Sequence, residues 1–229
     1  MRNTPVIVFI NKLDRPCKEP FDLLDEVERE LQIRVRPLAF PISSGDTFKG
    51  VYNIYEKNLS LFTTDERQTA DAETVDFSDI SSPELDGYIG EKFANQLRED
   101  VELVEGVYDE YNNEDYLTGK LAPVFFGSAL TNFGVETFLQ HFLQMTTAPL
   151  PRKSDQGDID PMEEEDFSAF VFKIQANMNK AHRDRLAFMR ICSGKFQRPT
   201  EYFHMQGGKK MRLSQPQQLM AAEREIVEE

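Results

Sequence analysis

The stretch "VIVFINKLDRP" (Val6–Pro16) decides how the first part of this chain is built. Its apolar half, which ends at Ile10, is typical of a strand buried on both faces. An amide, a cation and a carboxylate follow at once, as Asn11, Lys12 and Asp14. Ligands of open α/β sheets bind beyond the carboxyl ends of the strands, so this position predicts a binding site.

The segments that follow alternate between helix and strand patterns. Residues 19–33 carry apolar side chains at helical spacing, and residues 34–42, "RVRPLAFPI", are again strand-like. Residues 122–130, "APVFFGSAL", predict another buried strand, and residues 134–145 predict a second helix. The β-α-β order indicates a doubly wound parallel sheet.

Residues 45–120 interrupt this sheet over a length far beyond that of an ordinary loop. Within them, "FKGVYNIYEKNLSLF" alternates like a β-hairpin, and Ser82-Pro83 start a predicted helix whose apolar positions run to Val104. We therefore expect an inserted α+β subdomain inside a first domain at residues 1–150. The proline-rich and acidic residues 151–166 predict a linker.

The remaining residues, 167–229, have the pattern of β structure. Residues 167–178, 185–196 and 200–205 are predicted strands separated by polar turns. Their spacing indicates a β-barrel, with too few strands to close it. The expected fold class is α/β plus β.

Composition limits the function classes. The chain has 229 residues, of which 40% are hydrophobic and 29% charged, as in soluble globular proteins. No apolar run approaches the roughly 20 residues that span a bilayer, so no membrane partner is expected. Cys17 and Cys192 are isolated and only 3 histidines occur, so we expect no disulfide framework and no metal site, and a cytoplasmic location fits best.

The net charge of −14 is unevenly distributed. Residues 1–167 carry 15 Lys and Arg against 34 Asp and Glu, whereas residues 168–212 carry 10 Lys and Arg against Asp184 and Glu201 alone. A basic segment in an acidic protein is what a docking face for phosphates requires. The alternative is a solvated basic barrel surface without a partner.

The polar residues at the two strand ends suit a guanine base. Asp14 can accept two parallel hydrogen bonds from the ring N–H and the exocyclic amine of guanine, which adenine does not offer in this arrangement. The Lys12 stem can lie over the purine, and Asn11 can bond its edge or tether a neighbouring loop. The small residues Ser128 and Ala129, after the second strand, would let a backbone N–H approach the guanine carbonyl. Helix capping is the alternative role for Asn11 and Asp14.

These residues carry a family resemblance. "NKLDR" and "GSAL" resemble the guanine-recognition motifs of translational GTPases, and the subdomain resembles the insert of elongation factor G-like proteins. "APLPR" and "FVFKIQANMNKAHRDRLAFMRICSGKF" resemble the bacterial peptide chain release factor 3 family. The resemblance covers essentially the whole chain. It implies the C-terminal half of a doubly wound, P-loop-type G domain with an insert, followed by a truncated translation-factor barrel.

The resemblance also implies the activity of a longer protein. Such factors hydrolyse GTP on the ribosome, with GTP or GDP and Mg²⁺ as ligands, and drive off class-I release factors; no DNA partner is implied. A translocation or ribosome-protection GTPase and a non-enzymatic RNA-binding module are the alternatives. The sequence holds no G-x-x-x-x-G-K-[ST] phosphate loop and no D-x-x-G segment, so we expect the catalytic residues upstream of Val6. This chain alone is expected to be inactive and to hold no nucleotide tightly.

The basic segment contains candidate contacts with ribosomal RNA. "HRDR" supplies His182, Arg183 and Arg185. In relatives of this family the barrel contacts RNA of the small ribosomal subunit, so the resemblance assigns these residues to the RNA. A charged hairpin turn with no partner is the alternative interpretation.

Overall fold

The computed structural model describes residues 4–61, 73–155, 157–176, 185–213, 215–220 and 223–228. The chain divides into two compact units, Met1–Thr146 and Thr147–Glu229. In the first unit the strands are β1 Val8–Ile10, β2 Arg34–Pro37, β3 Ala39–Ile42, β4 Gly50–Asn53, β5 Asn58–Leu61, β6 Glu73–Asp76 and β7 Leu121–Phe126. Its helices are α1 Pro20–Leu31, the 3-10 turn η1 Gly45–Thr47, α2 Glu84–Ile89, α3 Glu91–Val107, α4 Asn113–Leu117 and α5 Val135–Met145.

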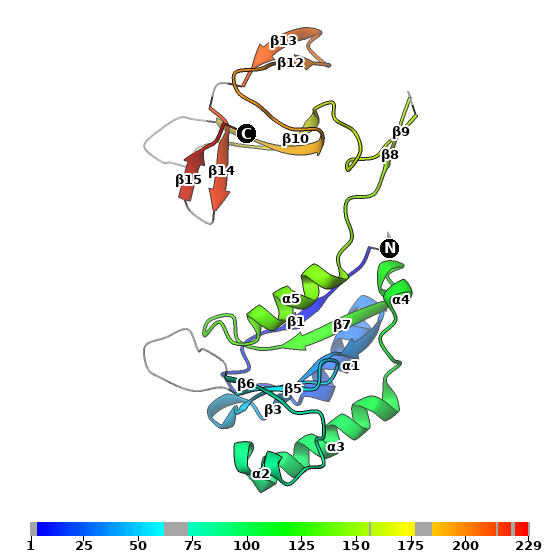
Figure 1. Cartoon of the computed structure of the whole chain (residues 1–229), viewed down its shortest axis with the longest axis vertical. Coiled ribbons are helices and arrows are strands. Elements are labelled where there is room, and N and C mark those ends of the chain that lie inside the picture. The colour runs from blue at the N-terminus through cyan, green and yellow to red at the C-terminus, as the bar shows by residue number, and fades with distance from the viewer. Residues whose placement is uncertain are drawn as a thin grey trace. The chain divides into compact units, whose positions relative to one another are not determined.

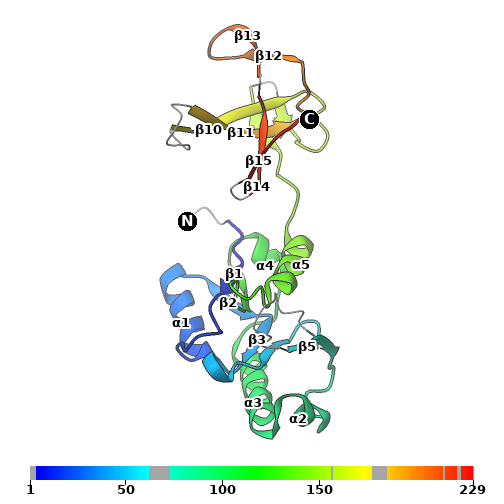
Figure 2. The same cartoon turned by 90° about the vertical axis from the view of Figure 1, so that its left-hand side faces the viewer.

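A three-stranded parallel sheet with the order β1-β7-β2 forms the centre of the first unit (Figure 1). Every residue of β7 is buried, which explains its continuous apolar sequence. The sheet is covered by α5 on one face, where Phe138 contacts Phe9 and Phe125. On the other face Phe21 of α1 packs on Phe40 of β3, whose ring in turn contacts Phe126 of β7. The parallel sheet therefore lies between the two helices (Figure 2). The predicted parallel α/β arrangement is confirmed.

A second, antiparallel sheet with the order β3-β4-β5-β6 lies beside the first. The segment expected as one strand, residues 34–42, leaves the parallel sheet at Pro37 and enters the antiparallel sheet at Ala39. Only Leu38 separates the two strands, and its N–H donates to the Val124 carbonyl of β7 (3.0 Å). The second sheet therefore begins before residue 45, where the insert was expected to start.

The helical part of the insert is broken where the sequence predicted one helix. Gly90, at φ 89°, ends α2 and caps α3. Left-handed backbone at this position suits glycine, and it redirects the chain between the two helices. Figure 1 shows α2 and α3 together on one side of the second sheet.

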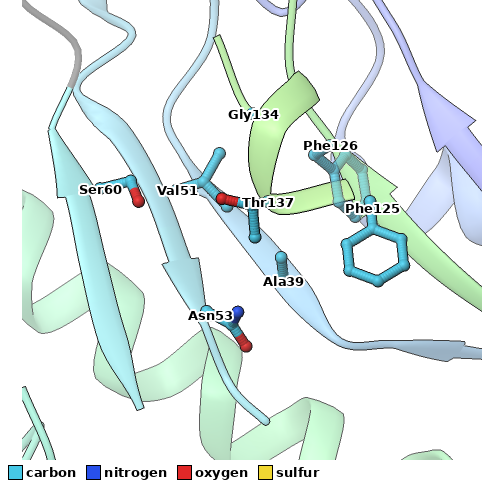
Figure 3. A pocket seen from close by; sticks show the side chains of 8 residues that line it. All are labelled: Ala39, Val51, Asn53, Ser60, Phe125, Phe126, Gly134 and Thr137. Carbon is cyan, nitrogen blue, oxygen red and sulfur yellow. The ribbon is translucent and has the colours of Figure 1, made fainter. Parts of the chain in front are cut away.

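A small cavity of about 10 Å³ lies between the two sheets and α5. The residues that line it include Asn53 of β4, Thr137 of α5, and Phe125 and Phe126 of β7 (Figure 3). This volume is about the minimum for one water molecule. It is too small for a nucleotide.

The second unit consists of two-stranded antiparallel pairs. These are β8 Arg152–Ser154 with β9 Gly157–Ile159, β10 Ser168–Ala176 with β11 Arg185–Ser193, β12 Glu201–His204 with β13 Lys209–Arg212, and β14 Gln217–Met220 with β15 Glu223–Ile226. The residues expected as a linker thus contain a short hairpin. The three predicted barrel strands are present, whereas a truncated barrel is not confirmed, because the pairings among the described residues join the strands only two at a time.

Candidate guanine-recognition site

The loops after β1 and β7 meet at one edge of the parallel sheet. Ile10 is paired with Phe126 in parallel register, so the two strands end side by side. The N–H of Gly127 donates to the Ile10 carbonyl (3.0 Å), and the N–H of Leu13 donates to the Gly127 carbonyl (3.1 Å). Backbone hydrogen bonds therefore continue beyond the strands and fix one loop against the other.

Asn11 joins the two loops through its side chain. Its Oδ1 accepts from the N–H of Ala129 (2.8 Å) and from the N–H of Lys12 (2.8 Å). Of the roles considered for Asn11, the tether between loops is present. The Ala129 N–H that was assigned to a guanine carbonyl is thus paired with Asn11, and its contact with guanine stays a prediction.

Asp14 has an unpaired oxygen at this edge. The side chain is 17% exposed, and its Oδ1 is buried without a hydrogen-bond partner among the described residues. The other oxygen, Oδ2, lies 4.0 Å from Nε of Arg15, which is beyond hydrogen-bond distance. A buried acceptor left unpaired costs about 1–3 kcal/mol, which an additional hydrogen-bond donor would offset. The N-cap position of α1 belongs to Glu19, so Asp14 does not cap that helix.

Lys12 and Ser128 differ in exposure. Lys12 is exposed and its backbone is left-handed, at φ 72°, which turns the chain sharply between Asn11 and Asp14. Ser128 is completely buried, its backbone pairs with that of Phe133 (3.0 and 2.9 Å), and its Oγ has no partner among the described residues. All five predicted residues therefore lie in two loops that are joined to each other.

Leu13, which the sequence reasoning missed, and Gly127, for which it expected only a small-residue turn, hold this site. Leu13, the free position of N-K-x-D, is fully buried, and its carbonyl accepts from the N–H of Gly45 (2.9 Å). A Cβ at Gly127 would lie 2.4 Å from the Phe133 carbonyl oxygen and 2.8 Å from the Phe9 ring. An apolar residue inside a polar motif and a glycine directly after a buried strand were the available signals.

The RNA-contact candidates are only partly described. Arg185 is the first residue of β11 and is exposed. His182 and Arg183 lie outside the described residues. No group of three His, Cys, Asp or Glu side chains in the described ranges is arranged to hold a metal ion. None of the described helices is long and apolar enough to cross a membrane.

Comparison with known proteins identifies the class. The family model described as "Elongation factor Tu GTP binding domain" matches residues 1–148, and that described as "Elongation factor G domain 2" matches residues 166–229. The chain belongs to the family of translation factors that carry an elongation factor Tu-type GTP-binding domain. A crystal structure of a protein from Thermus thermophilus has the same fold, with a TM-score of 0.62 at 18% identity over 98% of this chain and 32% of that one.

Within this family, the similarity is to peptide chain release factor 3. A protein of that name from Symbiobacterium thermophilum is 48% identical over all 229 residues, and one from a Cyanothece species is 46% identical over 228 residues. The recognition of this family from sequence is confirmed. The chain spans 43% and 42% of the lengths of these two relatives.

Proposed function

We propose that the protein to which this chain belongs is a ribosome-associated GTPase of translation termination, and that this chain contributes its guanine-recognition site. The observation that carries the proposal is the pairing of Asn11 with Ala129 beside the unpaired, buried Oδ1 of Asp14. Asp14 accepts from the ring N–H and exocyclic amine of guanine. Lys12 lies over the purine. The tether to Ala129 uses the side-chain oxygen of Asn11, and the side-chain nitrogen donates to the purine edge.

The residues of this chain fit the guanine base of a nucleotide and not its phosphates. A buried carboxylate oxygen without a donor matches the paired donors of guanine and repels the corresponding lone pair of adenine. GTP or GDP with Mg²⁺ would supply the phosphate chemistry of the intact protein, and the phosphate loop that grips them has no counterpart in this sequence. The contribution of this chain is to select and orient the base.

The role in termination rests on the names of the relatives. The two relatives compared above align over the whole chain and are called peptide chain release factor 3, which favours termination over translocation or ribosome protection. We propose that the intact protein promotes GTP-dependent departure of class-I release factors from the ribosome. Ribosomal complexes carrying a labelled class-I factor test this: the intact protein with GTP accelerates loss of the label, and acceleration of translocation instead would contradict it.

The Asp14→Asn variant of the intact protein tests the base-recognition site. The change replaces one acceptor with a donor, so affinity for GTP falls at least about tenfold and affinity for xanthosine triphosphate rises. Competition binding with both nucleotides measures the two effects. Asp22→Asn, an exposed aspartate in the first turn of α1, is the matched control and leaves both affinities unchanged. Affinities that move in the same direction would show that Asp14 does not read the base.

For this chain by itself, a second candidate function is RNA binding without catalysis. The observation that favours it is the concentration of positive charge in residues 168–212 of an otherwise acidic chain. Phosphate contacts make such binding weaken with salt. Capture of ribosomal subunits by the chain should therefore fall as ionic strength rises, and binding that ignores salt would contradict a phosphate-contact interface.

A further inference from the structure

The β10–β11 pair presents one face that combines aromatic rings with cations. The register pairs Phe170 with Arg190 and Lys173 with Phe188, and side chains paired across strands share a face. Phe172 is the extra residue of a bulge between Val171 and Lys173. Its ring lies 6.2 Å from that of Phe188, which places it on the same side. We call Phe170, Phe172, Lys173, Phe188 and Arg190 the aromatic face.

Two rings of the aromatic face are largely open to solvent, whereas Phe188 is half-buried. Phe170 is 55% exposed and Phe172 is 60% exposed. The Nζ of Lys173 lies 5.6 Å from the centre of the Phe188 ring, so a cation and a ring already share one surface. Two large rings left in water beside two exposed cations are typical of a surface that meets a partner.

The opposite face of the same strands has a different character. Val171, Ile174 and Ile191 are exposed there to similar extents, and they are aliphatic. An aliphatic surface suits packing against other apolar groups. Rings alternating with cations instead suit a ligand that has flat π faces and negative charge, because bases stack on phenylalanine while phosphates approach Lys and Arg.

We propose that the aromatic face binds an unpaired segment of RNA, with bases stacked on Phe170 and Phe172 and phosphates beside Lys173 and Arg190. Residues 168–212 carry 10 Lys and Arg against 2 acidic residues, so the surrounding field favours a polyanion. A duplex hides its base faces within the stack, which makes a single strand the better occupant. The inference rests on the proposed function, because a ribosome-associated factor meets RNA, and it names the binding surface and the form of the RNA.

Binding of short RNA to the 229-residue chain tests the inference. The probe is a fluorescein-labelled oligouridine of about 12 nucleotides, compared with a duplex of equal length, in fluorescence anisotropy from about 50 to 200 mM salt. The chain binds the single strand more tightly than the duplex. Phe172→Ala weakens this binding at least about fivefold, whereas Phe172→Tyr, which keeps the ring, restores it. Lys173→Gln and Arg190→Gln each reduce the salt slope by about 0.7.

Matched variants test whether RNA binding depends on the aromatic face or only on the positive charge of the second unit. Ile174→Ala removes a side chain of similar exposure (67%) from the opposite face, and Lys153→Gln removes a cation outside the basic segment; both leave affinity unchanged. Circular dichroism confirms that each variant is folded. Equal affinity for duplex and single strand, or equal losses in Phe172→Ala and Ile174→Ala, would overturn the proposal. GTP hydrolysis by the intact protein is measured separately. If the native chain shows no preference for the single strand while the intact protein hydrolyses GTP, this inference alone is contradicted.

Discussion

The Asn11 side-chain oxygen accepts two hydrogen bonds from backbone N–H groups. One bond fixes the turn at Lys12 and the other holds Ala129 of the second loop, 118 positions away along the chain. This oxygen thus adds a side-chain tether to the main-chain bond between Leu13 and Gly127 that joins the same two loops. The tether to the loop that holds Asp14, the proposed base-reading carboxylate, comes from an amide for which the sequence left ligand contact, tethering and helix capping open.

We predict that Asn11→Ala loosens both loops together. Losing two backbone partners costs about 1–2 kcal/mol of unfolding free energy. Hydrogen exchange at the Ala129 and Lys12 amides becomes faster, and guanine-nucleotide affinity of the intact protein falls. Asn95→Ala on the exposed side of α3 is the control. Unchanged protection at Ala129 would show that the tether does not form.

Tyr108, which follows α3, gives a pH-dependent prediction. Burial raises the pKa of its phenol from the ordinary 10 to about 12, with a smaller effect from the carboxylates of Asp25 and Glu28. Folding therefore favours the neutral phenol. Its contribution is complete below about pH 10 and is lost as the pH rises through about 12.

Denaturant titrations at increasing pH measure this contribution. Between about pH 10 and 12, unfolding free energy of the native chain falls by on the order of 1–2 kcal/mol more than that of Tyr108→Phe. Tyr88→Phe, at a position 46% exposed, is the control and keeps the native pH dependence. If Tyr108→Phe also keeps it, the phenol is not buried in solution.

At the scale of elements, the sequence predicted the parts of the site better than the boundaries around it. The strand-then-polar pattern at Ile10–Asn11 and the small turn at Gly127 located both loops, since buried strands and tight turns are local signals. The single helix expected after Ser82-Pro83 breaks at Gly90, and residues 34–42 divide at Leu38. Gly90 was a local signal for the first break, because glycine adopts the positive φ found there. The break at Leu38 instead depends on where the distant strand β7 lies, which one window of sequence does not contain. The role of Leu13 was missed for the same reason.

Two glycine substitutions separate close packing from helix propensity. Gly127→Ala places a Cβ against the Phe133 carbonyl and the Phe9 ring, so it destabilises the protein by about 1–3 kcal/mol and disturbs the site. Gly106→Ala, within α3, meets nothing within 4 Å and stabilises by up to about 1 kcal/mol. Thermal unfolding of both variants checks the opposite signs. A neutral Gly127→Ala would mean that the strand end and Phe9 are not packed as described.

At the scale of the whole molecule, the chain combines a proposed base-recognition site with a basic segment at residues 168–212, and its sequence lacks a phosphate loop. Most of the affinity of GTPases for nucleotide comes from the phosphate cradle and Mg²⁺. We predict that the 229-residue chain neither hydrolyses GTP nor binds it tightly. Calorimetry should give a dissociation constant weaker than about 1 μM. Nanomolar binding, with adenine nucleotides as the control, would contradict this prediction.

Leu38 gives the first unit a mechanical property. Its N–H is bonded to β7 of the parallel sheet, and its carbonyl accepts from the N–H groups of Ile54 (2.8 Å) and Tyr55 (3.3 Å) in the insert. A load applied to the insert is therefore transmitted through main-chain bonds to the strand that ends in the Gly127 turn. A displacement of the segment around Ile54 and Tyr55 would therefore reach the proposed guanine-recognition edge through a single residue.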